Sequence, residues 1–381
     1  MKTTYFCALF LIYAYVTCGE EMQVEERQDE VIRLGLYFVY DKAFSSRALF
    51  KVNESYNAYF AALTRAAQEF FKLHNDPKIL LTLVGSSQLQ EEDIIANTTT
   101  SDKKLNASET LDKLGTIMTW NNSLDTGVDV VFLATGMQLY IKESWMTGEW
   151  YGLSYRRSIC YGNATVGIIH DDGATFNGVR LTALQIALVL GAYKDNGKWG
   201  ECPQNEEEEY LTSNSRGGRI PYLSECSRES VRNFYYRFRD NDDICWKDIP
   251  KPAIEHDIGF PSDFYKLFDC DHCHVSEHFR NNTATGQAIN CSLSTINRNI
   301  PHWPKRQQTR WDWAARKRYR QWYRKHTTTV SPYQTCTQSC CRFMRHANTR
   351  GKGGWWDCWD TRAADGTVCD SLRVCLDREC A

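Results

Sequence analysis

Apolar residues recur along the first two thirds of the chain in blocks, and the blocks alternate between two spacings. Runs of β-branched and aromatic residues predict strands, and apolar residues three or four positions apart predict helices. The predicted order is strand 31–40, helix 55–74, strand 78–84, helix 108–120, strand 128–134, an edge strand at 165–170, and helices 179–193 and 227–238. This alternation predicts an α/β fold.

The helix at 179–193 differs from the others because it is apolar on nearly every face. A helix with no polar face is expected to be buried within the domain. The helix at 227–238 begins with Ser227, which is expected to cap its first turn.

The periodic pattern fades beyond Pro250, and cysteines become dense instead. Seven of the 16 cysteines lie between Cys336 and Ala381, so we expect an irregular, disulfide-rich region there. A chain of 381 residues has room for one large and one small domain. We expect a signal peptide at 1–18, a main domain at 19–250, a cysteine-containing connection at 251–302, a basic-aromatic segment at 303–326 and a Cys-rich domain at 327–381.

The first 18 residues predict a secretory signal peptide, with Lys2 before a short apolar run. That run is too short to cross a bilayer, and no later stretch predicts a membrane anchor. Two of the 16 cysteines lie in this segment, so cleavage would leave 16 − 2 = 14. An even number of cysteines in a secreted chain is typical of disulfide bonding. Seven sequons predict N-glycosylation, at Asn53, Asn97, Asn106, Asn121, Asn163, Asn281 and Asn290.

Charge is concentrated in residues 303–326, which contain nine Lys or Arg and one Asp, a net charge of 9 − 1 = +8. The rest of the chain therefore carries −2 − 8 = −10. If the segment is helical, Arg316, Arg320 and Arg324 share one face. We expect this face to bind a sulfated glycan, because nucleic acid is a less suitable partner outside the cell. The alternative is that its Trp and Tyr side chains pack on a neighbouring domain.

Two other motifs are interpreted as structural. Cys270 to His274 has the C-x-x-C-H spacing of covalent haem attachment, but disulfide-bonded cysteines beside solvated histidines are expected in so cysteine-rich a region. The four acids from Glu206 to Glu209 are interpreted as a solvated loop and not as a calcium site.

Several short stretches carry a resemblance to a known family. They are Gly152-Leu153-Ser154-Tyr155 through Cys160, Gly191-Ala192-Tyr193 with Asp195, Tyr210 to Ser213, Leu223 to Ser227, and Asp365 to Cys369 with Cys375 and Cys380. In this order they resemble the reprolysin family of metalloproteases, which covers snake-venom and ADAM/ADAMTS enzymes, and most of all its secreted tick salivary branch. The resemblance implies a metzincin-type zinc-protease fold for the main domain.

The same resemblance places the family's zinc ligands on Leu184, Leu188 and Lys194, and its general base on Gln185. Leucine has no lone pair, a protonated lysine repels a dication, and an amide takes up no proton at neutral pH. The Met of the family's Met-turn falls on Thr212. The sequence therefore predicts a pseudoprotease without zinc or another cofactor.

Such a protein is expected to act by binding an extracellular host protein or a glycan. One alternative is an active secreted metalloendopeptidase that uses a different site. Another is a matrix-adhesive module acting through the C-terminal half. The resemblance also implies two disulfides, Cys160–Cys245 and Cys202–Cys226.

Overall fold

The computed structural model describes the chain in segments. They are residues 30–48, 53–89, 104–120, 127–143, 146–160, 165–195, 202, 209–213, 220–241, 245–255, 258–267, 337–345, 354–362, 368–370, 373–376 and 379–380.

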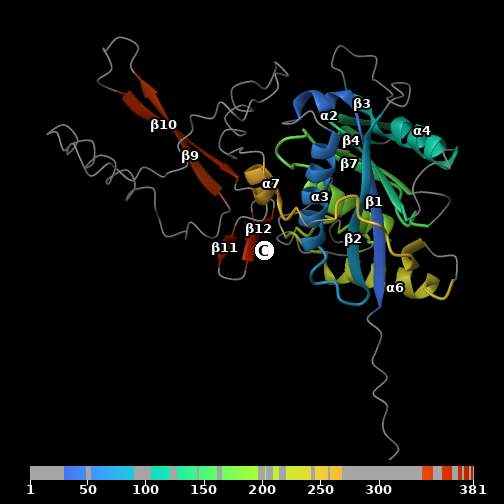
Figure 1. Cartoon of the computed structure of the whole chain (residues 1–381). Coiled ribbons are helices and arrows are strands. Elements are labelled where there is room, and N and C mark those ends of the chain that lie inside the picture. Colours follow the sequence, from blue (N-terminus) through green and yellow to red (C-terminus); the bar gives the residue numbers. More distant parts are fainter. Residues whose placement is uncertain are drawn as a thin grey trace, which may run out of the picture.

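A five-stranded sheet forms the centre of the main domain (Figure 1). Its order is β2 (Lys78–Gln88), β1 (Val31–Tyr40), β4 (Val130–Thr135), β8 (Thr165–His170) and β7 (Gly152–Ser154). The first four strands are parallel, and β7 pairs antiparallel with β8. The described main domain is therefore a mixed α/β fold with a mainly parallel sheet, as the alternating pattern predicted.

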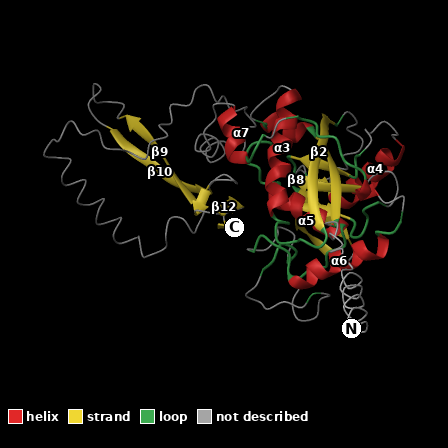
Figure 2. Cartoon of the chain, turned by 60° about the horizontal axis from the view of Figure 1, so that its bottom comes forward, coloured by secondary structure: helices red, strands yellow, loops and turns green. Residues whose placement is uncertain are grey.

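Helices cover both faces of this sheet (Figure 2). On one face, α3 (Asn53–Glu69) and α5 (Val179–Val189) pack with the side chains of Leu34, Leu36 and Phe132. On the other face, α4 (Ala107–Trp120) packs with the alternate side chains of the same strands. Strands buried on both faces read as nearly continuous apolar runs, which is why the sequence identified them.

The strand at Thr165–His170 has the predicted bounds, but it is not the sheet edge. It lies between β4 and β7, and the three-residue strand β7 is the edge. The sequence prediction was wrong because β7 is too short to give a periodic signal. Five of the six residues of β8 are buried, which agrees with an inner strand.

Smaller elements complete the domain, and one extends it past residue 250. Phe264 and Tyr265 of α7 (Pro261–Leu267) are buried against Phe176, and the Tyr265 hydroxyl donates to the carbonyl of Ala174 (2.6 Å). The core thus extends beyond the expected boundary. The others are α2 (Lys42–Arg47), β3 (Leu105–Asn106), β5 (Leu139–Glu143), β6 (Met146–Trp150), α6 (Glu225–Phe238) and a 3₁₀ turn (Cys245–Lys247).

The C-terminal residues contain regular strands where the sequence predicted irregular structure. Strands β9 (Thr337–Arg345) and β10 (Gly354–Arg362) form an antiparallel pair. Strands β11 (Val368–Asp370), β12 (Arg373–Leu376) and β13 (Glu379–Cys380) form a second small sheet. Clustered Cys and Trp residues interrupt the two-residue alternation that identifies a strand from sequence.

The cap of α6 is Ser224 and not Ser227. The backbone N–H of Ser227 donates to the Ser224 hydroxyl (3.1 Å), so the helix begins at Glu225, two residues before the predicted start. Among the described helices, none combines the length and apolar character needed to span a bilayer. The predicted signal peptide lies outside the described residues.

Candidate functional site

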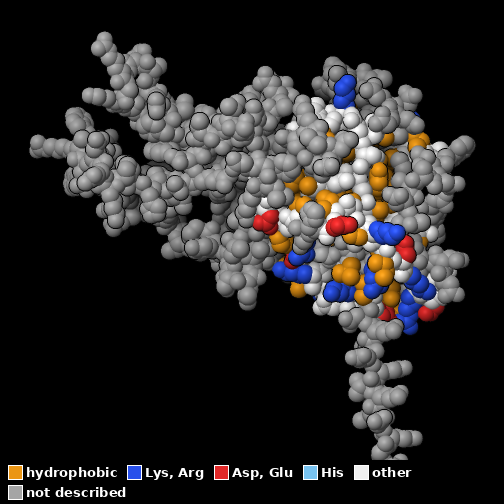
Figure 3. Space-filling view, viewed as in Figure 1, with side chains coloured by type: hydrophobic (Ala, Val, Ile, Leu, Met, Phe, Trp, Pro, Cys, Tyr) orange, Lys and Arg blue, Asp and Glu red, His pale blue; other side chains and the backbone are white. Residues whose placement is uncertain are grey.

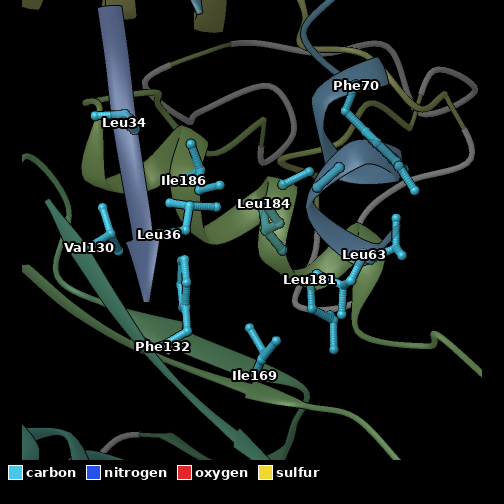
Figure 4. Packing of buried hydrophobic residues seen from close by; sticks show 14 of the residues in the cluster. Leu34, Leu36, Leu63, Phe70, Val130, Phe132, Ile169, Leu181, Leu184 and Ile186 are labelled. Atoms are coloured by element: carbon cyan, nitrogen blue, oxygen red, sulfur yellow. The ribbon is translucent and has the colours of Figure 1, made fainter. Parts of the chain in front are cut away.

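Helix α5 is the element on which the resemblance places its catalytic residues, and it is buried along its whole length. All eleven of its residues are buried, as its uniformly apolar sequence predicted. Figure 4 shows Leu181, Leu184 and Ile186 of this helix among side chains of β1 and α3. A helix in this position contributes to the core and presents little surface to solvent.

Leu184 and Leu188 occupy the positions implied for two zinc-binding histidines. They are 3% and 7% exposed, and both belong to the core cluster on the α3–α5 side of the sheet. Burying each leucine contributes about 1.5–3 kcal/mol to folding. Their chemical role here is apolar packing, since neither side chain can donate a lone pair to a metal.

Gln185 occupies the position implied for the general base, and its amide is held by the edge strand. The Ser154 hydroxyl of β7 donates to Oε1 of Gln185 (2.8 Å). A Cβ atom at Gly152 would lie 2.9 Å from Nε2 of Gln185 and 3.1 Å from the carbonyl oxygen of Ile168, so the strand and the Gln185 side chain approach closely at this glycine. The amide is therefore fixed against β7 through a hydrogen bond that it accepts.

The turn that ends α5 is built on Gly191, which has a φ of 97°. This left-handed conformation lets the N–H of Gly191 donate to the Leu188 carbonyl and the N–H of Ala192 to the Ala187 carbonyl. A Cβ atom there would also lie 3.2 Å from atoms of Arg157 and Phe234. The glycine that the sequence matched is thus required by backbone geometry.

Lys194, the position implied for the third ligand, is exposed after this turn. Partial burial of its ammonium group and the positive charge of Arg156 lower the pKa of Lys194. The guanidinium of Arg156 lies 4.3 Å from the ring centroid of Tyr193, and that of Arg157 lies 5.1 Å from it. The surface beyond α5 is therefore cationic and aromatic.

A buried carboxylate, Asp195, organises the chain that follows. It is 3% exposed and accepts hydrogen bonds from the hydroxyls of Thr212 (2.5 Å), Ser224 (2.6 Å) and Ser227 (3.4 Å). Thr212, which stands at the implied Met-turn position, thus contributes a hydroxyl donor. The sequence showed Asp195 only as a matched residue. The convergence of three distant hydroxyls on it depends on the fold.

Of the two implied disulfides, the described side chains contain one completely and one cysteine of the other. A disulfide joins Cys202 and Cys226, the pair that the resemblance implied. It links the loop after α5 to the first turn of α6, next to the Asp195 cluster. Cys160 is also disulfide-bonded, but the side chain of Cys245 lies outside the described residues, so the pairing Cys160–Cys245 stays a prediction.

The donor set does not fit zinc. Two buried leucines, a hydrogen-bonded amide and an exposed cation stand at the four implied positions, and zinc requires Cys, His or carboxylate ligands. The described residues elsewhere contain no group of three or more His, Cys, Asp or Glu side chains arranged to hold a metal ion.

The remaining predicted sites lie mostly outside the described residues. Asn106 is described, and its side chain caps the start of α4 by accepting from the N–H of Glu109 (3.4 Å). Asn53 begins α3, but its side chain is not described. The other sequons, the cysteines and histidines of 270–274, residues 206–208, and Arg316, Arg320 and Arg324 lie outside the described segments.

Comparison with known proteins adds little to this geometry. Neither the models of known protein families nor the curated proteins include a match to this chain. Among solved structures, the chain is similar to the crystal structure of archaemetzincin from Methanopyrus kandleri, with a TM-score of 0.33 and 10% identity, over 54% of this chain and 97% of that one.

Proposed function

We propose that this chain is a secreted, reprolysin-like protein that acts by binding and not by zinc-dependent peptide hydrolysis. The observation that carries the proposal is the chemistry of α5. Leu184 and Leu188 are part of the core, and Gln185 accepts a hydrogen bond from Ser154. A metalloprotease needs three ligands that hold zinc and a base that takes a proton from the bound water.

The partner is proposed to be an extracellular protein or a sulfated glycan. The cationic and aromatic surface formed by Arg156, Arg157, Tyr193 and Lys194 supports an acidic partner. The basic segment 303–326 supports the same class of partner through its sequence alone.

Zinc content and peptidase activity test the first part of the proposal. The purified full chain is expected to carry no stoichiometric zinc by elemental analysis and to cleave no general protein substrate. The combined change Leu184→His, Gln185→Glu, Leu188→His and Lys194→His supplies the missing groups. This variant is expected to contain more zinc than the wild type. It keeps Thr212 at the position where the family has methionine.

A matched variant separates ligation from a change in folding. Leu184→Asn with Leu188→Asn introduces comparable polar groups into the core without imidazoles, so it should lose stability and gain no zinc. Circular dichroism on each variant reports whether the domain is folded. Stoichiometric zinc in the wild-type protein, with proteolysis that a chelator abolishes, would contradict the proposal.

A further inference from the structure

A pocket of about 380 Å³ lies between the segment after β7 and helix α6. Arg157 lines it from one side, and Asn233, Phe234, Arg237 and Phe238 line it from α6. Pockets of about 300–1,000 Å³ are the size class that holds small molecules or single side chains. The lining residues do not include Leu184, Gln185, Leu188 or Lys194, which stand at the implied zinc-site positions.

The α6 wall has two parallel rows because residues four apart share a helix face. Asn233 and Arg237 form one row and are exposed. Phe234 and Phe238 form the next, with ring centroids 5.0 Å apart. The wall therefore pairs a row that can donate hydrogen bonds with a row that offers aromatic surface.

Among the described residues, neither arginine has an acidic partner. No described carboxylate forms an ion pair with the guanidinium of Arg237, which lies 5.5 Å from the ring centroid of Phe238. Nη2 of Arg157 donates to the hydroxyl of Tyr193 (3.0 Å), while its Nε is buried and makes no hydrogen bond to a described residue. No described carboxylate therefore neutralises the positive charge at the pocket. Figure 3 shows Lys and Arg side chains, with some Asp and Glu among them, on the surface around α6.

Arg157 is held in place before any ligand binds. Its φ is 58°, a left-handed conformation that few residues other than glycine adopt. Its backbone N–H donates to the Leu188 carbonyl at the end of α5 (3.0 Å), and its guanidinium contacts the Tyr193 ring. A guanidinium that is already positioned loses less conformational entropy when an anion binds.

We infer that this pocket binds an oxyanion carried on an aromatic ring, such as an aryl sulfate or aryl phosphate. Paired guanidinium donors match the oxygens of such a group, and the Phe row contacts the ring. This ligand class rests on the proposed function, in which the chain acts by binding, and it narrows the acidic partner to one that presents this group.

Titration calorimetry with small probes tests the inference on the full chain. Phenyl sulfate and phenyl phosphate are expected to bind, and their relative affinities distinguish the two sources of the group. Phenol, which has the ring alone, and inorganic sulfate, which has the anion alone, should each bind roughly tenfold or more weakly than the better ester.

Variants locate the site. Arg237→Gln should weaken binding of the esters by roughly tenfold or more, because it removes a charged donor from an exposed position. Arg232→Gln removes an exposed arginine from the same helix outside the pocket and should leave the affinity unchanged. Phe238→Ala should weaken phenyl sulfate binding more than inorganic sulfate binding.

Three results would overturn the inference. They are equal affinities for the Arg237 and Arg232 variants, phenol binding as tightly as phenyl sulfate, and no heat of binding for either ester up to about 10 mM. Zinc content and peptidase activity, measured on the same preparation, report on the proposed function alone. The two ideas can therefore fail separately.

Discussion

At the scale of single residues, Asp129 is a buried carboxyl group whose environment affects stability. It precedes β4, is 4% exposed, and accepts a hydrogen bond from the N–H of Gly35 (2.7 Å). Burial raises its pKa to about 7, with the Gly35 bond opposing the shift and the charge of Asp248 adding to it. The folded protein therefore holds a proton on Asp129 at pH values where the unfolded chain has released it.

This shift sets the sign of a pH effect. The contribution of Asp129 is fully present below its unfolded pKa of about 4 and is lost as pH rises through about 7. Asp129→Asn keeps an acceptor for Gly35 and removes the ionisation. Between pH 5 and pH 8 the wild type should lose about 2 kcal/mol of unfolding free energy more than this variant does.

Urea unfolding at the two pH values measures the difference. Asp240→Asn, which removes one exposed carboxylate, is the control and should follow the wild type. A parallel pH dependence of Asp129→Asn and the wild type would mean that Asp129 is ionised in the folded state at both values.

The sequence excluded chemical roles for single residues more successfully than it predicted the contacts that these residues make. That Leu184 and Gln185 cannot serve a zinc site follows from their own chemistry, so it was visible without a structure. The hydrogen bond between Ser154 and Gln185 joins residues 31 positions apart in the sequence. Arg157 and Arg237, which line the same pocket, are separated by a still longer stretch of sequence. Such contacts depend on the fold and leave no local pattern.

At the scale of elements, a single hydroxyl, that of Ser224, has two roles at the start of α6. Ser224 accepts from the N–H of Ser227 and donates to the buried carboxylate of Asp195 (2.6 Å). A cap alone contributes about 0.5–2 kcal/mol, and loss of a donor from a buried carboxylate adds to this. Ser224→Ala is therefore expected to reduce the unfolding free energy by about 2–3 kcal/mol.

Ser224→Asp separates the two roles, because aspartate is a good N-cap but brings a second negative charge to Asp195. We expect it to be at least as unstable as Ser224→Ala at pH 7 in thermal and urea unfolding. If the aspartate variant regained wild-type stability, capping would be the main role of Ser224.

The elements themselves were predicted with uneven success, for physical reasons. Strands 31–40 and 165–170 match the structure in both bounds, since buried parallel strands give continuous apolar runs. The edge assignment was wrong because a three-residue strand such as β7 has no periodicity. The cap of α6 was misplaced because Ser224 and Ser227 are both suitable residues, and only the hydrogen bond distinguishes them.

At the scale of the whole molecule, an α/β class followed from the order of the blocks, while the arrangement of β3, β5 and β6 as a separate sheet did not. The order of strands in a sheet depends on which apolar faces pack together. The sequence shows which faces are apolar but does not show which face packs against which. The extension of the core to α7 was missed for the same reason, because Phe264 and Tyr265 contact residues more than eighty positions away.

The uneven distribution of charge gives the last prediction. Residues 303–326 carry +8 beside −10 in the rest of the chain, and they lie outside the described segments, so the prediction rests on sequence. Exposed charges attract a sulfated glycan less as salt shortens the Debye length to about 3 Å at 1 M. The full chain should therefore bind heparin and elute with salt.

Changing Arg316, Arg320 and Arg324 together to Ala should lower the salt concentration needed for elution. Changing Lys305, Arg306 and Arg310 to Ala removes the same charge from outside the proposed face, and should lower it less. Equal shifts for the two triple variants would mean that net charge and not one helical face determines binding. If the first variant eluted at the same salt concentration as the wild type, these arginines would be excluded as the binding site. If circular dichroism showed that this variant is unfolded, a packing role for the segment would be favoured.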